Sequence, residues 1–242
     1  MKVDFYFSYR SPYSYFILPR LKKLIEEYDV DVNFRLVYPL AIRKPSFFKN
    51  KNMLTYFFWR LLDYRKVANR HEMPFFRPKP DPIVQNIITG KISPEHPYIF
   101  YICHLGQAAH YHGQGINFAQ ALSNKIFGSK EGWFERKSLS KVCDSVGLNL
   151  DDLEKEVNEQ EAKIISDIKY NQEQQLAAGH HGVPLLVHGD QYFFGQDKFD
   201  EFLSFMHKNG MQRKLTKLFM TRELSTFLKL SLILKKSFQK KK

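Results

Sequence analysis

The sequence predicts a mixed α/β fold that is interrupted by an all-helical insertion. A strand-helix-strand pattern opens the chain, a strand hairpin followed by a helix closes its body, and residues 97–177 between them contain no convincing strand. With 242 residues, 43% apolar and 26% charged, the chain fits one large globular domain or one domain that carries an insertion.

The opening pattern is visible residue by residue. Residues 3–8 are aromatic and β-prone, and Ser11 followed by Pro12 is typical of a helix N-cap with proline in the first helical position. Leucine and isoleucine then recur at helical spacing, so we expect a helix from Ser11 to about Tyr28. Residues 30–37 alternate between apolar and polar side chains, which predicts a second strand.

The middle of the chain is predicted to be helical. A helix covers about residues 54–67, and residues 74–82, which include four prolines, form a loop. Three or more helices fit residues 97–177, including one over residues 151–176 whose acidic first turn suits a helix N-terminus.

The closing unit has its own signals. Residues 182–188 return to strand character, Gly189-Asp190 predicts a turn, and residues 191–194 form the partner strand. Asp197 begins a further helix, because apolar residues after it recur at helical spacing.

Composition excludes several classes of protein. The longest apolar runs are a few residues, far short of the ~20 needed to span a bilayer. The early acidic residue Asp4 argues against a signal peptide, and two cysteines, Cys103 and Cys143, are too few for a disulfide scaffold or a thiolate zinc site. We therefore expect a protein of the reducing cytoplasm.

Four short motifs follow one another at suitable distances along the chain. They are Asp4-Phe5-Tyr6-Phe7, Ser11-Pro12-Tyr13-Ser14-Tyr15, Gly182-Val183-Pro184 and Phe194-Gly195-Gln196-Asp197-Lys198. In this order they closely resemble the 2-hydroxychromene-2-carboxylate isomerases and the related kappa-class glutathione transferases, which belong to the DsbA-like branch of the thioredoxin superfamily. The resemblance covers about residues 2–207, and its specificity lies in the four motifs together.

This resemblance implies a thioredoxin-like (DsbA-like) fold with an all-helical insertion domain. Residues 1–80 and 178–207 would form the thioredoxin-like domain, and residues 81–177 the helical insertion. Residues 208–242, which the resemblance does not cover, would be a basic helical C-terminal extension.

Ser11 and Ser14 stand where a thiol oxidoreductase of this fold carries Cys-x-x-Cys. A serine cannot cycle through a disulfide, so DsbA-type disulfide exchange is excluded. The helix N-terminus can still stabilise a thiolate that a substrate brings, and the resemblance assigns the hydrogen bond to that sulfur to Ser11. An ordinary helix cap is the alternative reading of Ser11. Ser14 is an auxiliary position, as is Arg10, which either lowers the thiol pKa or points into solvent.

Val183 and Pro184 are the next candidates. Proline cannot donate to a strand ladder, so its position at the head of a strand indicates a cis peptide bond, with a trans strand-edge proline as the alternative. The backbone of Val183 would then pair with an extended peptide such as glutathione. His180 and His181 depart from the apolar residues common in the family; His181 places a titratable group near the thiol, unless both are solvated loop residues.

Gln196 and Asp197 stand at the start of the last helix of the body. In relatives this region contacts the γ-glutamyl end of glutathione, so the resemblance assigns both residues to glutathione binding. A capping role is an equally good reading of Asp197.

Trp59 and Asp63 lie four residues apart on one helical face, so they could line a pocket together. They fall where relatives place an aromatic residue and an aspartate, and the resemblance therefore assigns both to glutathione binding. Tyr56 replaces a basic residue that relatives often carry, which leaves recognition of the glycyl carboxylate to another cation. The cations that could replace it are Lys51, Arg60 and Arg43.

Two further groups of residues, a set of possible metal ligands and the many aromatic residues, give weaker signals. Cys103, His104, His110 and His112 do not converge on one helical face, so no metal is expected. The many phenylalanines and tyrosines belong mostly to the core, but part of them could wall an aromatic substrate site between the thioredoxin part and the helical block.

Together these features predict a glutathione-dependent isomerase of the 2-hydroxychromene-2-carboxylate isomerase type. The glutathione thiolate, activated by Ser11, would add reversibly to a small, electrophilic, conjugated aromatic substrate, and glutathione would be regenerated each turn. A kappa-like glutathione transferase, which retains the thioether, is the close alternative. A non-catalytic thioredoxin-fold ligand-binding protein is the alternative from another class, and Tyr56 with His180-His181 favours it.

The basic tail predicts a partner of its own. The net charge of the chain is +12, of which +10 lies in residues 208–242. An amphipathic helix there would bind an anionic membrane surface. Packing of the tail on the body or on a partner subunit competes closely, nucleic acid ranks third, and the oligomeric state, a homodimer included, is left open.

Overall fold

The computed structural model describes residues 1–48, 52–86 and 88–214. Its sheet has the strand order β2-β1-β3-β4, in which β1 and β2 are parallel and each later pair is antiparallel. The strands are β1 (Lys2–Phe7), β2 (Asp31–Leu36), β3 (Leu185–His188) and β4 (Gln191–Phe194). All four were predicted, but β3 begins later than residue 182 because Pro184 has no N–H to give to the ladder.

The helices follow the predicted order. They are α1 (Pro12–Glu27), α2 (Leu40–Arg43), α3 (Met53–Arg70), α4 (Ile99–Tyr111), α5 (Gly115–Phe127), α6 (Arg136–Ser145), α7 (Leu150–Ala177) and α8 (Phe199–Lys208), with 3-10 turns η1 (Pro45–Phe48) and η2 (Gln196–Lys198). The sequence did not predict α2 and η1, because single turns are too short to show a helical period.

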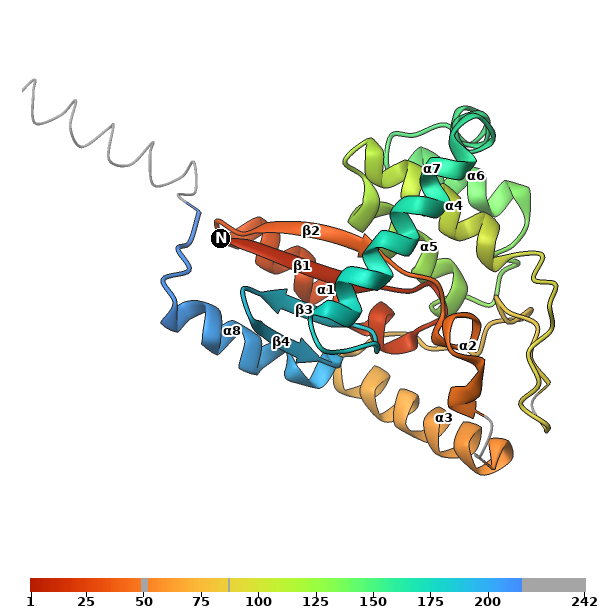
Figure 1. The fold of residues 1–242 in the computed structure, drawn as a ribbon, viewed down its shortest axis with the longest axis horizontal. Coiled ribbons are helices and arrows are strands. Elements are labelled where there is room, and N and C mark those ends of the chain that lie inside the picture. The colour runs from red at the N-terminus through yellow and green to blue at the C-terminus, as the bar shows by residue number, and fades with distance from the viewer. Residues whose placement is uncertain (49–51, 87, 215–242) are drawn as a thin grey trace, which may run out of the picture.

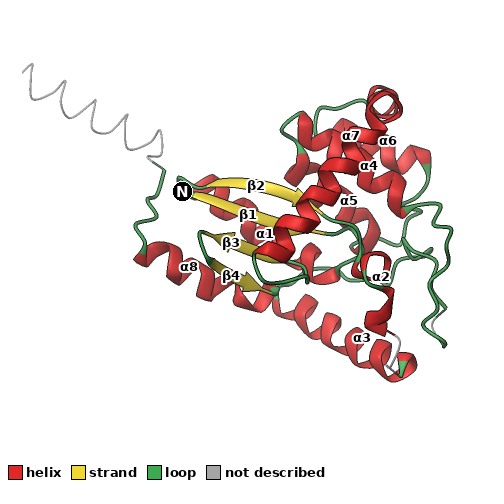
Figure 2. Ribbon diagram, in the orientation of Figure 1, coloured by secondary structure: helices red, strands yellow, loops and turns green. Residues whose placement is uncertain are grey.

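Helices cover both faces of the sheet. Figure 1 shows α7 passing in front of the strands and α1 behind them, and Figure 2 shows the four strands as one layer. Val3, Phe5 and Phe7 of β1 belong to the large core that contains α1, whereas Tyr6 packs in a smaller cluster near Ala178 at the end of α7. This alternation is what a strand covered on both faces requires.

The order of elements is that of a thioredoxin-like fold, with α4 to α7 inserted between its two halves. This confirms the predicted fold class. After α8 the chain returns to the end of α1, where the Lys214 amide donates to the Glu27 carbonyl at 2.8 Å. The helix predicted for the basic tail lies largely in residues 215–242, outside the described residues. Within the described ranges, no helix has both the length and the apolar character that crossing a membrane requires.

Candidate functional site

Ser11 caps the N-terminus of α1. Its Oγ accepts a hydrogen bond from the Ser14 amide at 3.2 Å, and Pro12 occupies the first helical position, as predicted. Pro12 has no N–H, so Tyr13 and Ser14 carry the first amides at this positive end of the helix dipole. The first turn contains no acidic residue that would cancel this field.

The loop before β3 lies directly opposite Ser11. The Val183-Pro184 bond is cis, as the sequence indicated. The Ser11 hydroxyl donates to the Val183 carbonyl at 3.5 Å, a long hydrogen bond that a competing acceptor could replace. The Val183 amide has no hydrogen bond to the described part of the chain. A helix N-terminus, a hydroxyl and a free backbone amide therefore meet at one place.

These groups open into a cavity of about 510 Å³, which we call the serine cavity. Its walls come from the N-terminus of α1, from α2 and α3, from the loop before β3 and from the end of β4. Its polar and charged lining residues are Ser8, Arg10, Ser11, Tyr13, Tyr56, Arg60, Asp63, Tyr64, Lys66, Arg70, Gln196 and Asp197. Cations outnumber carboxylates in this set, so the cavity suits a ligand of net negative charge.

Tyr13, Arg60 and Asp63 form a polar network on one wall of the serine cavity. The Tyr13 hydroxyl donates to the Asp63 carboxylate and accepts from the Arg60 guanidinium at 3.1 Å. Burial and the bond to Asp63 both raise the pKa of Tyr13, so its hydroxyl remains a neutral donor. The guanidinium of Arg60 also lies over the rings of Tyr13 and Tyr56. Arg60 is thus the cation that α3 offers one turn beyond Tyr56.

Gln196 and Asp197 differ in what they can offer a ligand. The Gln196 side chain is buried, and its Oε1 accepts from Arg20 at 2.8 Å and lies 3.0 Å from His71 Nε2. Its amide oxygen is therefore already bonded. Asp197 is exposed at the rim of the serine cavity, where its carboxylate can meet a ligand cation.

Trp59 does not line the serine cavity with Asp63. Its side chain is 63% exposed and packs edge-on against Phe58. The spacing of the two residues is helical, but Trp59 lies on the outer side of α3. Arg43 is also engaged elsewhere, because it donates to the Tyr38 and His181 carbonyls at 2.7 and 3.0 Å. The third replacement cation that the sequence offered, Lys51, lies outside the described residues.

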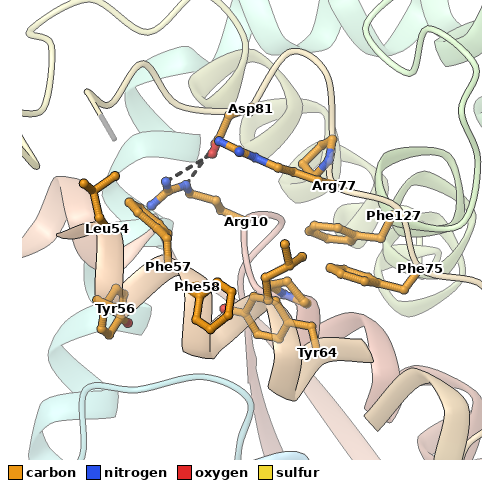
Figure 3. Close-up of a pocket in the computed structure, with 13 residues that line it drawn as sticks. Arg10, Leu54, Tyr56, Phe57, Phe58, Tyr64, Phe75, Arg77, Asp81 and Phe127 are labelled. Atoms are coloured by element: carbon orange, nitrogen blue, oxygen red, sulfur yellow. Dashed lines mark hydrogen bonds and ion pairs between the residues drawn. The ribbon is translucent and has the colours of Figure 1, made fainter. Parts of the chain in front are cut away.

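A second cavity of about 330 Å³ adjoins the first, and we call it the aromatic cavity. Figure 3 shows its wall of rings, with Phe75 and Phe127 side by side. Its lining residues are Arg10, Pro12, Leu54, Tyr56, Phe57, Phe58, Leu61, Tyr64, Phe75, Arg77, Pro78, Asp81 and Phe127. Burial raises the pKa of Tyr64 to about 12, so its ring adds no charge to this wall at neutral pH.

The loop over residues 74–82 closes one side of the aromatic cavity. Three hydrogen bonds to its main chain hold it: from Tyr15 Oη to Pro74 O at 3.0 Å, from Phe76 N to Phe127 O at 2.7 Å, and from Trp133 Nε1 to Pro80 O at 3.0 Å. The loop is thereby tied both to α1 and to the helical block. The expected position of an aromatic site, between these two parts, matches this cavity.

Arg10 lines both cavities and does not point into solvent. Its side chain is 16% exposed, and it donates to both carboxylate oxygens of Asp81, at 3.0 and 3.2 Å, and to Gln85 at 2.8 Å (Figure 3). Because Asp81 neutralises it, Arg10 gives little net positive charge to a thiol at Ser11. Asp81 gave no signal in the sequence, since it reaches Arg10 from a loop about seventy residues away.

Comparison with known proteins identifies the fold family. A family model described as a DSBA-like thioredoxin domain matches residues 98–207. The structure is similar to that of a 2-hydroxychromene-2-carboxylate isomerase (HCCA isomerase), with a TM-score of 0.66 and 18% identity over 86% of this chain and 95% of that chain. The chain therefore has a DsbA-like thioredoxin fold.

Two further solved structures have the same DsbA-like fold. The thiol-disulfide exchange protein α-DsbA2 from Wolbachia pipientis has a TM-score of 0.53 and 14% identity over 86% of this chain and 81% of that chain. The cytosolic disulfide reductase DsbM from Pseudomonas aeruginosa with GSH has a TM-score of 0.53 and 13% identity over 96% of this chain and 99% of that chain. At such identities the likeness concerns the fold alone. No curated protein sequence matches this chain.

Ser11 and Ser14 differ in their surroundings. Ser11 faces the serine cavity, whereas Ser14 is fully buried, lines neither cavity, and its hydroxyl has no partner in the described structure. The two cysteines are unpaired and buried among the helices, and burial raises the pKa of Cys143 to about 11. Among the described residues, no three His, Cys, Asp or Glu side chains gather as metal ligands would.

His181 also lies beside the serine cavity and not in its lining. Its ring is 6.4 Å from that of Phe47, which does line the cavity, and burial lowers its pKa. Sequence reasoning therefore located Ser11, Val183, Asp63 and Asp197 at the cavity. It missed the network around Tyr13, for which the only signal was the three-residue spacing of Arg60 and Asp63.

Proposed function

We propose that this DsbA-like protein binds glutathione in the serine cavity and activates its thiol for addition to a conjugated aromatic acceptor. The observation that carries the proposal is the position of Ser11, whose hydroxyl lies at the helix N-terminus and 3.5 Å from the Val183 carbonyl. A sulfur placed there would accept the hydrogen bond that the Ser11 hydroxyl now gives to Val183. It would also face the N-terminus of α1, whose positive field no acidic residue of the first turn cancels. Both interactions favour thiolate over thiol.

The rest of glutathione has suitable partners along the serine cavity. The free Val183 amide can donate to a peptide carbonyl of the ligand, in the manner of an added strand. Arg60, Lys66 and Arg70 follow one another on α3 and can receive a carboxylate. Asp197 can accept from the γ-glutamyl ammonium group. The solved structure of DsbM with GSH supports this ligand for the fold, and a cytoplasmic location would supply it in reduced form.

The adjoining aromatic cavity supports the acceptor class. Its wall of phenylalanine and tyrosine rings suits a flat, conjugated molecule, and Arg77 at its rim has no hydrogen bond or ion pair within the described ranges. A guanidinium in that position can bind the carboxylate group of the conjugated substrate. Both substrates would then meet at Pro12, Arg10 and Tyr56, which line both cavities.

In the isomerase reaction the thiolate sulfur supplies an electron pair for a new C–S bond to the conjugated carbon. Ring opening breaks the ring C–O bond of the hemiketal, whose electron pair and hydroxyl proton go to the phenol oxygen while the hemiketal carbon becomes a ketone. The π electrons that sulfur displaces move onto this ketone as an enolate, and the former double bond, now single, rotates. Elimination then uses the enolate electrons to re-form the double bond, breaks the C–S bond and returns its electron pair to sulfur. No oxidant is needed, and glutathione leaves unchanged, whereas a transferase would release the thioether.

Calorimetric titration with glutathione tests the binding step. We expect saturable binding to one site, and weaker binding of S-methylglutathione, which can form no thiolate. A screen with hydroxychromene carboxylates and simple electrophiles follows, with product analysis. Isomerised acceptor with constant glutathione supports the isomerase, and glutathione consumed one for one supports a kappa-like transferase. Absence of binding would overturn the proposal and leave a thioredoxin-fold protein with another ligand.

A further inference from the structure

His180 lies next to the ligand-facing loop but has no part in the site described so far. The Gly182 amide donates to His180 Nδ1 at 2.9 Å, across a tight turn that ends immediately before Val183. On its other side, the Gly182 carbonyl accepts from Gln175 at 2.7 Å. Gly182 is therefore held at both its N–H and its C=O, while the Val183 amide that follows stays available to a ligand.

The imidazole of His180 is itself fixed by aromatic contacts. Its ring centroid lies 4.0 Å from that of Phe194 and 5.7 Å from that of Tyr192, both on β4. The ring of His181 stacks parallel to it at 5.4 Å. A Cβ at Gly182 would collide with the rings of Phe194 and His180, so only glycine permits this close approach.

The hydrogen bond specifies the protonation state of His180. An Nδ1 that accepts from an N–H cannot carry a proton, so the neutral ring has its proton on Nε2. Protonation of Nδ1 would turn the acceptor into a donor that faces another donor. The contact with Gly182 therefore exists only while His180 is neutral.

We propose that His180 is a positioning residue that fixes Gly182, and through it the neighbouring Val183 amide, in place for the ligand and releases Gly182 on protonation. This inference rests on the proposed role of Val183 in glutathione binding. It makes ligand affinity dependent on pH through a residue that does not itself touch the ligand.

The surroundings of His180 determine the direction of this effect. Its titratable neighbours are His181 on its own loop and Tyr192 on β4, while the cations Arg43 and Lys44 act on His181. Burial, and then the charge of His181, hold the pKa of His180 below its ordinary value. The neutral, bonded form is therefore present at neutral pH, and affinity decreases only as the pH falls.

Two variants distinguish the hydrogen bond that His180 accepts from Gly182 from the packing of its ring on Phe194. In His180→Asn, the side-chain oxygen can accept from the amide two residues ahead, as in an Asx turn, and it does not titrate. In His180→Phe the aromatic packing on Phe194 is retained but the acceptor is lost. His188→Asn, at the far end of β3, is the matched control for the same substitution.

Affinity is measured by calorimetry from about pH 8 to about pH 5, a range that spans histidine titration, with S-methylglutathione as the ligand because it has no thiol that would add a pH dependence of its own. We expect the wild type and His188→Asn to lose affinity on acidification, and His180→Asn to keep it at all pH values. His180→Phe should bind about tenfold more weakly even at neutral pH, since the partly buried Gly182 N–H is left unpaired. An unchanged acid loss in His180→Asn would overturn the proposal.

Amide hydrogen exchange of Gly182 in the ligand-free protein tests the contact without glutathione. We expect protection, corrected for the intrinsic exchange rate, to disappear on acidification in the wild type and to persist in His180→Asn. Equal protection in the wild type and His180→Phe would overturn the proposal. If Gly182 responds as expected but glutathione binds at no pH, the positioning role of His180 is supported and the proposed ligand is rejected.

Discussion

Replacing Ser11 by alanine removes two interactions that can be measured separately. The hydroxyl is the proposed donor to the glutathione sulfur, and one preorganised donor to a developing anion contributes about 1.4 to 4 kcal/mol. We therefore expect Ser11→Ala to lower the turnover of the thiol-addition step by about tenfold to a thousandfold. The assay is the steady-state rate at saturating glutathione with an acceptor from the screen.

The same substitution also removes a helix cap. Ser11 Oγ accepts from the Ser14 amide, and loss of such a cap costs about 1 kcal/mol, which corresponds to a decrease in Tm of about 2 to 4 °C for a chain of this size. A matched control is Asn149→Ala, which removes the cap of α7. It should lower stability similarly and leave the rate unchanged.

Ser11→Asp distinguishes the two roles within one position. Aspartate caps a helix as well as serine does, so the free energy of unfolding should be retained. Its carboxylate cannot donate to sulfur and repels a thiolate, so the rate should fall at least as far as in Ser11→Ala. If Ser11→Ala and Ser11→Asp both keep the wild-type rate, Ser11 is only a cap and the proposed chemistry is wrong.

Four other perturbations follow from the same structure. Asp81→Asn leaves the Arg10 charge unpaired beside both cavities, so the pKa of bound glutathione thiol should fall by about one, as read from thiolate ultraviolet absorbance; an unchanged thiol pKa would show that Arg10 does not act on the sulfur. Phe58→Ala removes an exposed ring of the aromatic cavity, so KM for aromatic acceptors should rise several-fold while the Kd for glutathione stays constant; equal changes in both would contradict two separate cavities. Burial holds the pKa of His104 below its ordinary value of 6.5, so the unfolded chain binds protons more readily and the free energy of unfolding in urea should decrease as the pH falls below that value; His104→Asn should flatten this slope, and an identical slope would assign it to other groups. Truncation after Lys214, which spares the contact with Glu27, should preserve glutathione binding and abolish salt-sensitive binding to anionic vesicles; vesicle binding that survives truncation would exclude the tail as the anchor.

The sequence predicted best what depends on neighbouring residues. The cap at Ser11 and the cis bond before Pro184 are local properties of one or two residues, and both were predicted correctly. The strands also follow from local alternation. These elements locate the end of the serine cavity to which thiol binding is proposed, without any knowledge of tertiary structure.

Predictions that depend on the orientation of a whole helix were less successful. Trp59 and Asp63 share a helical spacing, but the way α3 packs turns Trp59 outward and Asp63 towards Tyr13. The pairing of Arg10 with Asp81 depends on how a proline-rich loop folds back onto α1. Neither the rotation of a helix about its axis nor the return path of a loop is encoded in a short motif.

The loop over residues 74–82 has a consequence for how such a protein can diversify. Three hydrogen bonds tie it to α1 and to the helical block through main-chain atoms of the loop, and the Asp81 side chain and the Phe75 ring add the other contacts. Arg77 and Pro78 can therefore be exchanged while the loop keeps these contacts. Selection could retune which acceptors are admitted without altering Ser11, the N-terminus of α1 or the Val183 peptide, to which the proposed thiol chemistry is assigned.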